Sequence, residues 1–202
     1  MSLWIGEPLV LASKSPSRRA LLEAAGIPLV LDPAEIDERG IEQSQAAGAG
    51  AKEVAVLLAR EKALATAARH KNAPVLGADQ TLALGERRFS KPASRDAARD
   101  QLAALAGKTH ELHSAAAISH GAKIVFEAVS TARLTMRALS PAFIDAYLDA
   151  AGERVTKSVG CYQLEGLGIH LFEEIDGDHF TILGMPLLPL LAYFRAAGMM
   201  RA

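Results

Sequence analysis

The amino-acid sequence predicts a mixed α/β protein, and three observations support this fold class. Short apolar runs alternate with segments of helical periodicity along the chain, as expected for a layered α/β domain. Pro or Ser precedes several helical segments and Gly follows them, which are ordinary signals for helix starts and ends. Two long strand-like segments, 108–119 and 124–137, are joined by a short turn, which favours a mixed sheet over a purely parallel one.

Each expected element follows from a local pattern of this kind. An acidic segment with Glu35, Asp37 and Glu38 follows the second expected strand. The sequence has no internal repeat and no long linker, so we expect a single domain over 1–202. The expected elements, in order, are a strand at 9–12, a helix from Pro16 to Gly26, a strand at 28–32, a mobile surface loop at 40–50, a helix at 51–69, a strand at 74–79, a helix from Ser94 to Gly107, strands at 108–119 and 124–137, a helix from Ser140 to near Gly152, a strand at 168–174 and a final helix from Pro186.

Composition narrows the classes of function. The chain has 22 Lys and Arg against 23 Asp and Glu, a net charge of -1, so no global basic field predicts binding to nucleic acid or to a membrane. Cys161 is the sole cysteine of the sequence, which excludes an internal disulfide and a multi-cysteine zinc site. The first residues lack the basic region of a signal peptide, and no apolar run has membrane-spanning length. We therefore expect a cytoplasmic protein.

The first candidate site is the segment Ser13-Lys14-Ser15-Pro16-Ser17-Arg18-Arg19. It places hydroxyls and two guanidinium groups at a helix start, and helix N-termini favour anions. Arg side chains also bind phosphate oxygens bidentately. The segment therefore fits a phosphate-binding loop, or equally a capped helix with two solvated arginines.

Two further segments carry residues suited to the same chemistry. We expect Asp79 to end a buried strand in Gly77-Ala78-Asp79-Gln80-Thr81, where an acid is costly unless it binds a metal, a cation or a polarised water. Asp79 could also simply cap a turn. Lys91-Pro92 could direct an ammonium to the same place, although such a pair is often an exposed loop.

Other motifs are weaker. Leu102 occupies the place of the first Gly that a P-loop ending in Gly107-Lys108-Thr109 would need, which argues against a P-loop phosphotransferase. His110 and His113 are three apart on an expected strand, so they should point to opposite faces and not bind one zinc ion. Cys161 has no activating base nearby in sequence and is expected to be a buried or boundary thiol, not a nucleophile.

In order and spacing, the motifs closely resemble the Maf (septum-formation) family of nucleotide pyrophosphatases, and the resemblance covers nearly the whole chain. The matching segments are Ser13–Arg19, Leu57–Ala63, Ala78-Asp79, Lys91-Pro92, Leu105–His110, Gly160–Gly166 and Gly184–Leu187.

The resemblance implies a fold, an activity and roles for individual residues. The implied fold is an elongated mixed sheet flanked by helices with a central cleft, as in inosine-triphosphatase-like proteins, usually in a homodimer. The implied reaction is hydrolysis of a nucleoside triphosphate to the monophosphate and pyrophosphate, with Mg²⁺ or Mn²⁺ as cofactor. Asp79 matches the general-base position, where a metal-ligand role is equally open, and Glu38 matches a second acid suited to metal. The implied phosphate-binding residues are Ser13, Arg18, Lys62 and Lys91.

The family divides by substrate, and three positions distinguish its branches. Here they are Ser17, Gln80 and Glu165, which resemble the branch that prefers 7-methyl-GTP more than the dTTP- and UTP-preferring branch. A carboxylate such as Glu165 could complement the positive charge of 7-methylguanine. Two alternatives stay open: a preference for dTTP or UTP, and a nucleotide-binding regulator of cell division with little catalysis. The retained Asp79, Lys62 and Lys91 favour the enzyme over the regulator.

Overall fold

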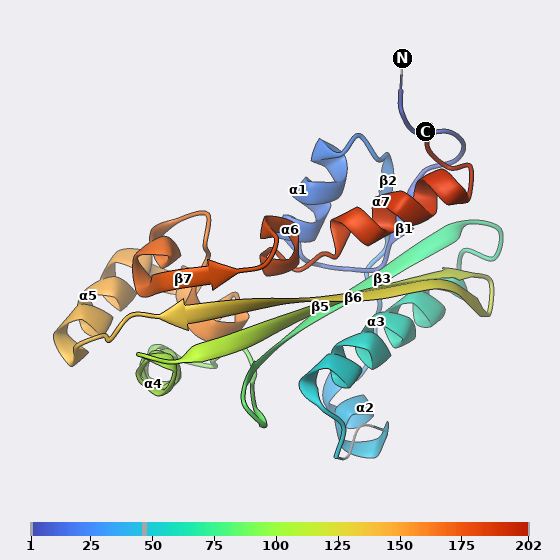
Figure 1. The fold of residues 1–202 in the computed structure, drawn as a ribbon. Coiled ribbons are helices and arrows are strands. Elements are labelled where there is room, and N and C mark those ends of the chain that lie inside the picture. Colours follow the sequence, from blue (N-terminus) through green and yellow to red (C-terminus); the bar gives the residue numbers. More distant parts are fainter. Residues whose placement is uncertain (1, 46–47, 202) are drawn as a thin grey trace. The chain divides into compact units, whose positions relative to one another are not determined.

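The computed structural model describes residues 2–45 and 48–201 and contains one mixed β-sheet flanked by helices (Figure 1). Its seven strands follow the order β2-β1-β3-β5-β6-β7, with β4 paired to β3. β1 pairs in parallel with β2 and β3, whereas the β3–β4 and β6–β7 pairs are antiparallel. The predicted mixed α/β fold class is therefore confirmed. In the described part of the chain no helix is both long and apolar enough to cross a membrane.

The chain forms two compact units, each made of segments that are separate in sequence. Unit 1 comprises 1–80, 113–130 and 179–202, and unit 2 comprises 81–112 and 131–178. The predicted single domain over 1–202 stays a prediction.

In unit 1, helices cover both faces of the sheet (Figure 1). On one face, α1 (Pro16–Ala24) and α7 (Leu187–Ala196) pack on side chains of β1 (Leu9–Leu11), β3 (Pro74–Leu84) and β5 (Thr109–His120). On the other face, α3 (Ala51–Ala67) packs its alanines on Ala115 and Ala117 of β5. Because successive side chains of a strand alternate between faces, Ala116 and Ile118 belong to the first layer and their neighbours to the second.

Unit 2 is built around two helices and a run of single turns. Ion pairs from Arg99 to Asp145 and from Arg95 to Asp149 join α4 to α5. Ser94 and Ser140 cap these helices by accepting a hydrogen bond from the third residue along, as expected for N-cap serines. The elements of unit 2 are α4 (Arg95–Leu105), β4 (Arg87–Phe89), α5 (Pro141–Ala151), the 3-10 turns η1 (Gly152–Thr156), η2 (Val159–Cys161) and η3 (Leu167–Leu171), and β7 (Phe172–Asp176).

The predicted loop at 40–50 is wrong for its first part, because Glu38–Gln45 forms helix α2. The carboxylate of Asp37 accepts a hydrogen bond from Gly40 N at 3.0 Å, which caps the helix start. Ile41 packs on the buried Val54 and Leu58 of α3, so one apolar residue anchors the helix. Residues 46 and 47 lie outside the described residues.

Two strand boundaries also differ from expectation. Asp79 does not end its strand: β3 continues to Leu84, because Leu82, Ala83 and Leu84 pair with β4 in a hairpin. The predicted strand at 168–174 is η3 up to Leu171 and becomes β7 only from Phe172. The turn passes close to the backbone of Gln163 at Gly168, where a Cβ would lie 2.9 Å from the N and C atoms of Gln163.

The remaining predicted helices and strands are present with shifted ends. They include the strands β2 (Leu29–Leu31) and β6 (Lys123–Met136). The structure also contains the short helix α6 (His179–Ile182).

Candidate functional site

The candidate site of unit 1 lies just past the end of β1. Leu11 of β1 pairs with Leu76 of β3, so β3 extends beyond its parallel neighbour and carries Asp79 three residues further. Ser13 follows β1 at the same edge, and its hydroxyl accepts hydrogen bonds from Ser15 N and from Arg18 Nη1. The carboxyl edge of parallel strands is the usual place for ligand sites in α/β proteins.

Lys62 connects two carboxylates at this edge. Its Nζ lies 2.6 Å from Asp79 Oδ1 and 2.8 Å from Glu38 Oε1. Lys62 and Asp79 are 8% and 7% exposed, whereas the Glu38 side chain is 49% exposed at the first position of α2. The structure therefore brings together three of the predicted residues: the general base, a phosphate-binding lysine and the second acid.

Arg18 completes this cluster from helix α1. Its Nε donates to Gly184 O at 2.9 Å, and its Nη1 donates to Ala78 O at 2.8 Å and to Ser13 Oγ at 3.2 Å. Within the described residues its hydrogen bonds involve Nε and Nη1, which leaves Nη2 to contact a ligand. A guanidinium held this way is oriented before a phosphate binds, so the side chain loses less conformational entropy on binding.

Burial sets the electrostatics of the site. Desolvation raises the pKa of Asp79 above its ordinary value, and the positive charges of Lys62 and Arg18 partly offset this rise. Desolvation also lowers the pKa of Arg18, while the nearby Asp79 and Glu38 act in the opposite direction. A carboxylate with a raised pKa and two adjacent cations can accept a proton from water beside a bound polyanion.

A divalent metal ion would fit the two carboxylates. Glu38 and Asp79 contact the same ammonium, so they can bind one cation together. Mg²⁺ is typically bound through one or two carboxylates, with phosphate oxygens and water completing its shell. Among residues 2–45 and 48–201 no group of three or more His, Cys, Asp or Glu side chains could hold a metal ion, so the remaining ligands would come from substrate and water.

The predicted specificity residues Ser17 and Gln80 differ in how the structure uses them. Ser17 lies half-buried in the first turn of α1, beside Arg18 in sequence. Gln80 follows Asp79 on β3 and donates its amide hydrogens to atoms of the protein itself.

The other two predicted site residues belong to unit 2. Lys91 is exposed on the segment that follows β4. Glu165 is exposed in the turn between η2 and η3. Their position relative to Asp79 stays a prediction.

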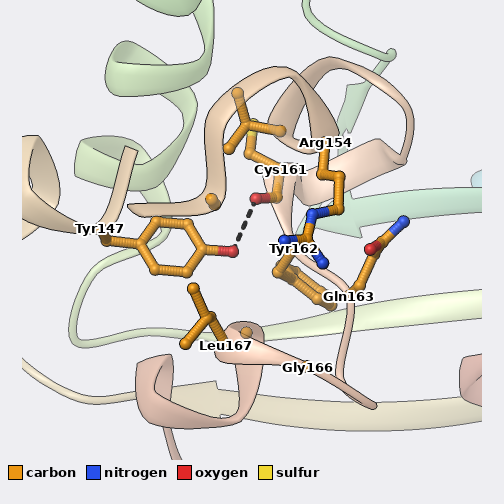
Figure 2. Close-up of a pocket in the computed structure, with 10 residues that line it drawn as sticks. Tyr147, Arg154, Cys161, Tyr162, Gln163, Gly166 and Leu167 are labelled. Atoms are coloured by element: carbon orange, nitrogen blue, oxygen red, sulfur yellow. Dashed lines mark hydrogen bonds between the residues drawn. The ribbon is translucent and has the colours of Figure 1, made fainter. Parts of the chain in front are cut away.

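A pocket of unit 2 lies beside the loop that carries Glu165 (Figure 2). Its wall includes Tyr147, Arg154, Gln163 and Leu167, and Glu165 is not part of this lining. The hydroxyl of Tyr147 donates to Cys161 O at 3.1 Å, the bond drawn in Figure 2. The pocket wall is thus held by the same motif that supplies the predicted specificity residue.

The histidines and the cysteine that sequence analysis set aside are packed side chains. Cys161 is fully buried, and desolvation raises the pKa of its thiol to about 12, so it is not a ready nucleophile. His110 is also fully buried, and its Nε2 lies 2.7 Å from the hydroxyl of Tyr162. The expectation of a buried thiol at Cys161 is confirmed.

Two glycines that shape the site were not predicted from the sequence. Gly77 packs against the backbone of α3, and Gly184 packs against Arg18 with a φ of +97°. Both stood in quoted motifs, Gly77-Ala78-Asp79 and Gly184-Met185-Pro186, so the available signal was a glycine within a motif.

The sheet and this site define a class of protein. It is a mixed α/β protein in which a buried carboxylate and two cations could bind a phosphorylated ligand. The chain belongs to the Maf family, because the model of the Maf-like protein family matches residues 8–197.

Relatives of known name match the chain over almost its full length. A nucleoside triphosphate pyrophosphatase of Bradyrhizobium diazoefficiens is 60% identical over 197 residues, 97% of each chain. A 7-methyl-GTP pyrophosphatase of Mesorhizobium japonicum is 48% identical and covers 95% of this chain and 97% of its own. A dITP/XTP pyrophosphatase structure from Mycobacterium abscessus aligns with a TM-score of 0.40 at 18% identity, over 66% of this chain and 76% of that one.

Proposed function

We propose that the chain hydrolyses the phosphoanhydride between the α- and β-phosphates of a nucleoside triphosphate in the site formed by Asp79, Lys62 and Arg18. The names of the relatives that are 48–60% identical confirm the predicted class of enzyme, a nucleoside triphosphate pyrophosphatase. The observation that carries the residue assignment is the buried Lys62–Asp79 pair, 2.6 Å apart, next to a guanidinium fixed on the carbonyl of Ala78.

In this proposal the side chains of the site bind phosphate and activate water. Arg18 Nη2 and the Lys62 ammonium bind phosphate oxygens and neutralise charge that develops in the transition state. Asp79 accepts the proton of the attacking water, whose oxygen bonds to the α-phosphorus while the bond to the bridging oxygen breaks. The products are a nucleoside monophosphate and pyrophosphate. Lys91 would supply a further cation to the polyphosphate.

Glu38 and Asp79 would hold a divalent cation in this site. When bound, Mg²⁺ or Mn²⁺ would neutralise phosphate charge and orient the leaving group. The two carboxylates that share Lys62 supply the donor set for such an ion.

For the base, we propose a preference for 7-methyl-GTP. The pattern at Ser17, Gln80 and Glu165 supports it, and so does a relative named as a 7-methyl-GTP pyrophosphatase. Glu165 is exposed, so its carboxylate is available to complement a positively charged base. This preference would make the chain an enzyme that removes a modified nucleotide.

A nucleotide panel with product identification tests reaction and base choice together. The panel contains 7-methyl-GTP, GTP, dTTP, UTP and CTP, each with Mg²⁺ or Mn²⁺, and the products are separated by chromatography. We expect monophosphate and pyrophosphate, with 7-methyl-GTP hydrolysed fastest. Faster hydrolysis of dTTP or UTP would overturn the base assignment, and release of inorganic phosphate alone would overturn the reaction.

The same assay tests the site through two matched substitutions. Asp79→Asn keeps the shape of the side chain but removes the base, so turnover should fall by at least about 100-fold. Asp149→Asn is the control, since Asp149 is an exposed partner of Arg95 in unit 2. Near-parental turnover in Asp79→Asn would exclude Asp79 as the base.

A further inference from the structure

The orientation of Arg18 depends on the backbone of Gly184. Arg18 Nε donates to Gly184 O at 2.9 Å, although the two residues are 166 positions apart. A Cβ on Gly184 would lie 3.3 Å from Arg18 Nε and 3.7 Å from Gln80 Oε1. The backbone at Gly184 therefore lies against both the guanidinium and the side chain of Gln80.

Two polar side chains hold the segment that ends at Gly184. Gln80 Nε2 lies 3.0 Å from Ser114 Oγ, 3.1 Å from Thr181 O and 3.0 Å from Ile182 O. Ser114 Oγ in turn donates to Thr181 O at 2.7 Å. Ser114 and Thr181 are fully buried, where a lost hydrogen bond leaves an unsatisfied polar group.

These bonds leave no N–H of Gln80 for a nucleobase. An amide nitrogen has two hydrogens, and here three oxygens of the protein surround it. The Gln80 side chain therefore affects a substrate through the backbone at Thr181 and Ile182, which it holds in place.

We infer that Gln80 and Ser114 are positioning residues that fix the segment 181–184 and, through the Gly184 carbonyl, the guanidinium of Arg18. This inference rests on the proposed phosphate-binding role of Arg18. Together the two side chains and the segment form a brace, defined as Gln80, Ser114 and 181–184. All of its parts belong to unit 1.

The brace makes a prediction that does not depend on catalysis. The Nε–H of Arg18 should exchange slowly with solvent in the parent chain, because it is buried and donates to Gly184 O. The signal is assigned by its absence in Arg18→Lys. Removing part of the brace should release the carbonyl and accelerate this exchange.

The experiment compares Gln80→Met and Ser114→Ala with the control Ser119→Ala. Ser119 lies five residues from Ser114 on β5, is equally buried, and donates its hydroxyl to Ala63 O. Each variant is measured for Arg18 Nε–H exchange by NMR, for thermal unfolding, and for kcat/KM with 7-methyl-GTP and Mg²⁺.

We expect faster Arg18 exchange and a loss of kcat/KM of about 10- to 100-fold in the two brace variants, since small misplacements of a positioning group have effects of this size. Ser119→Ala should lose thermal stability similarly but keep Arg18 protection and kcat/KM. Unchanged Arg18 exchange in both brace variants overturns the inference, and so does equal loss of kcat/KM in Ser119→Ala. A parent chain that releases no pyrophosphate overturns the proposed function instead, and the exchange measurement still tests the brace.

Discussion

Gly77 faces the backbone of α3 at Ala63, and this close approach places Lys62 against Asp79. A Cβ on Gly77 would lie 2.5 Å from Ala63 N and would overlap the carbonyl oxygen of Ala59. Helix and strand therefore meet backbone to backbone, two residues before Asp79 on β3 and one residue after Lys62 on α3. The Lys62–Asp79 distance of 2.6 Å depends on this contact.

We predict that Gly77→Ala separates the pair. The added methyl must push α3 from β3, and overpacking of this kind costs about 1–3 kcal/mol. Pyrophosphate release should fall by more than the loss of stability explains, because Lys62 moves with the helix. Unfolding in urea and steady-state kinetics at a temperature where the variant is folded measure both effects.

Gly198→Ala is the control for this substitution. Its φ of +70° strains any other residue, yet no atom lies within 4 Å of the added Cβ. It should lose stability while keeping kcat. An active Gly77→Ala would show that the close packing does not set the Lys62–Asp79 geometry.

A second prediction concerns the charges of the Lys62–Asp79 pair. Lys62→Met leaves Asp79 buried beside fewer positive charges, and breaking a buried ion pair in this way costs about 3–5 kcal/mol. The double variant Lys62→Met/Asp79→Asn removes both charges and should be more stable than Lys62→Met alone. Urea unfolding of the parent, both single variants and the double variant measures the coupling; a double variant less stable than Lys62→Met contradicts the prediction.

The sequence predicted much of the fold because its signals are local. Pro16 and Gly26 fixed α1 within two residues, and Ser94 and Ser140 capped the helices that they were expected to cap. Helix α2 was missed because one capping Asp and one partly buried Ile stabilise a helix in a segment whose composition favours a loop. Tertiary packing, which a local pattern does not contain, decided that element.

The site was predictable only in part, for the same reason. Residue type alone marked Arg18 and Asp79 as candidates, but Lys62 and Glu38 entered through resemblance to a family. Their meeting depends on the close contact at Gly77 and on the turn into α2. The hydrogen bonds that the Gln80 amide donates to other atoms of the protein were not predictable, since their acceptors are more than 30 residues away in sequence.

A third prediction concerns Asp32, which joins the end of β2 to the end of α3. Arg69 donates two hydrogen bonds to its carboxylate and His70 Nε2 lies 2.7 Å away. Hydrogen bonds from Arg69 and then from His70 lower the pKa of Asp32 from 3.8 to about 2. A carboxyl with a lowered pKa in the folded chain stabilises it above pH 3.8, and this contribution is lost as the pH falls from 3.8 to about 2.

Asp32→Asn should therefore destabilise the chain at pH 7, and its difference from the parent should shrink between pH 4 and pH 2. Urea unfolding at several pH values measures this difference. Asp100→Asn, at an exposed position of α4, should show little change across the range. A difference between parent and Asp32→Asn that grows toward pH 2 would contradict the assignment.

The last prediction concerns His110, the buried base of unit 2. Desolvation lowers the pKa of its imidazole from 6.5 to about 4, and within the described residues its Nδ1 has no hydrogen-bond partner. The unfolded chain binds a proton at this histidine below pH 6.5, whereas the folded chain does so only near pH 4. Stability should thus fall between pH 6.5 and pH 4, by up to about 1.4 kcal/mol per pH unit for one proton.

His110→Gln should flatten the stability profile in this window, because glutamine does not titrate and can still contact the hydroxyl of Tyr162. His170→Gln, at an exposed histidine of η3, should keep the parental slope. Urea midpoints at half-unit steps from pH 7 to pH 4 measure the slopes. Equal slopes in the parent and His110→Gln would mean that the buried imidazole binds its proton as readily in the folded chain as in the unfolded one.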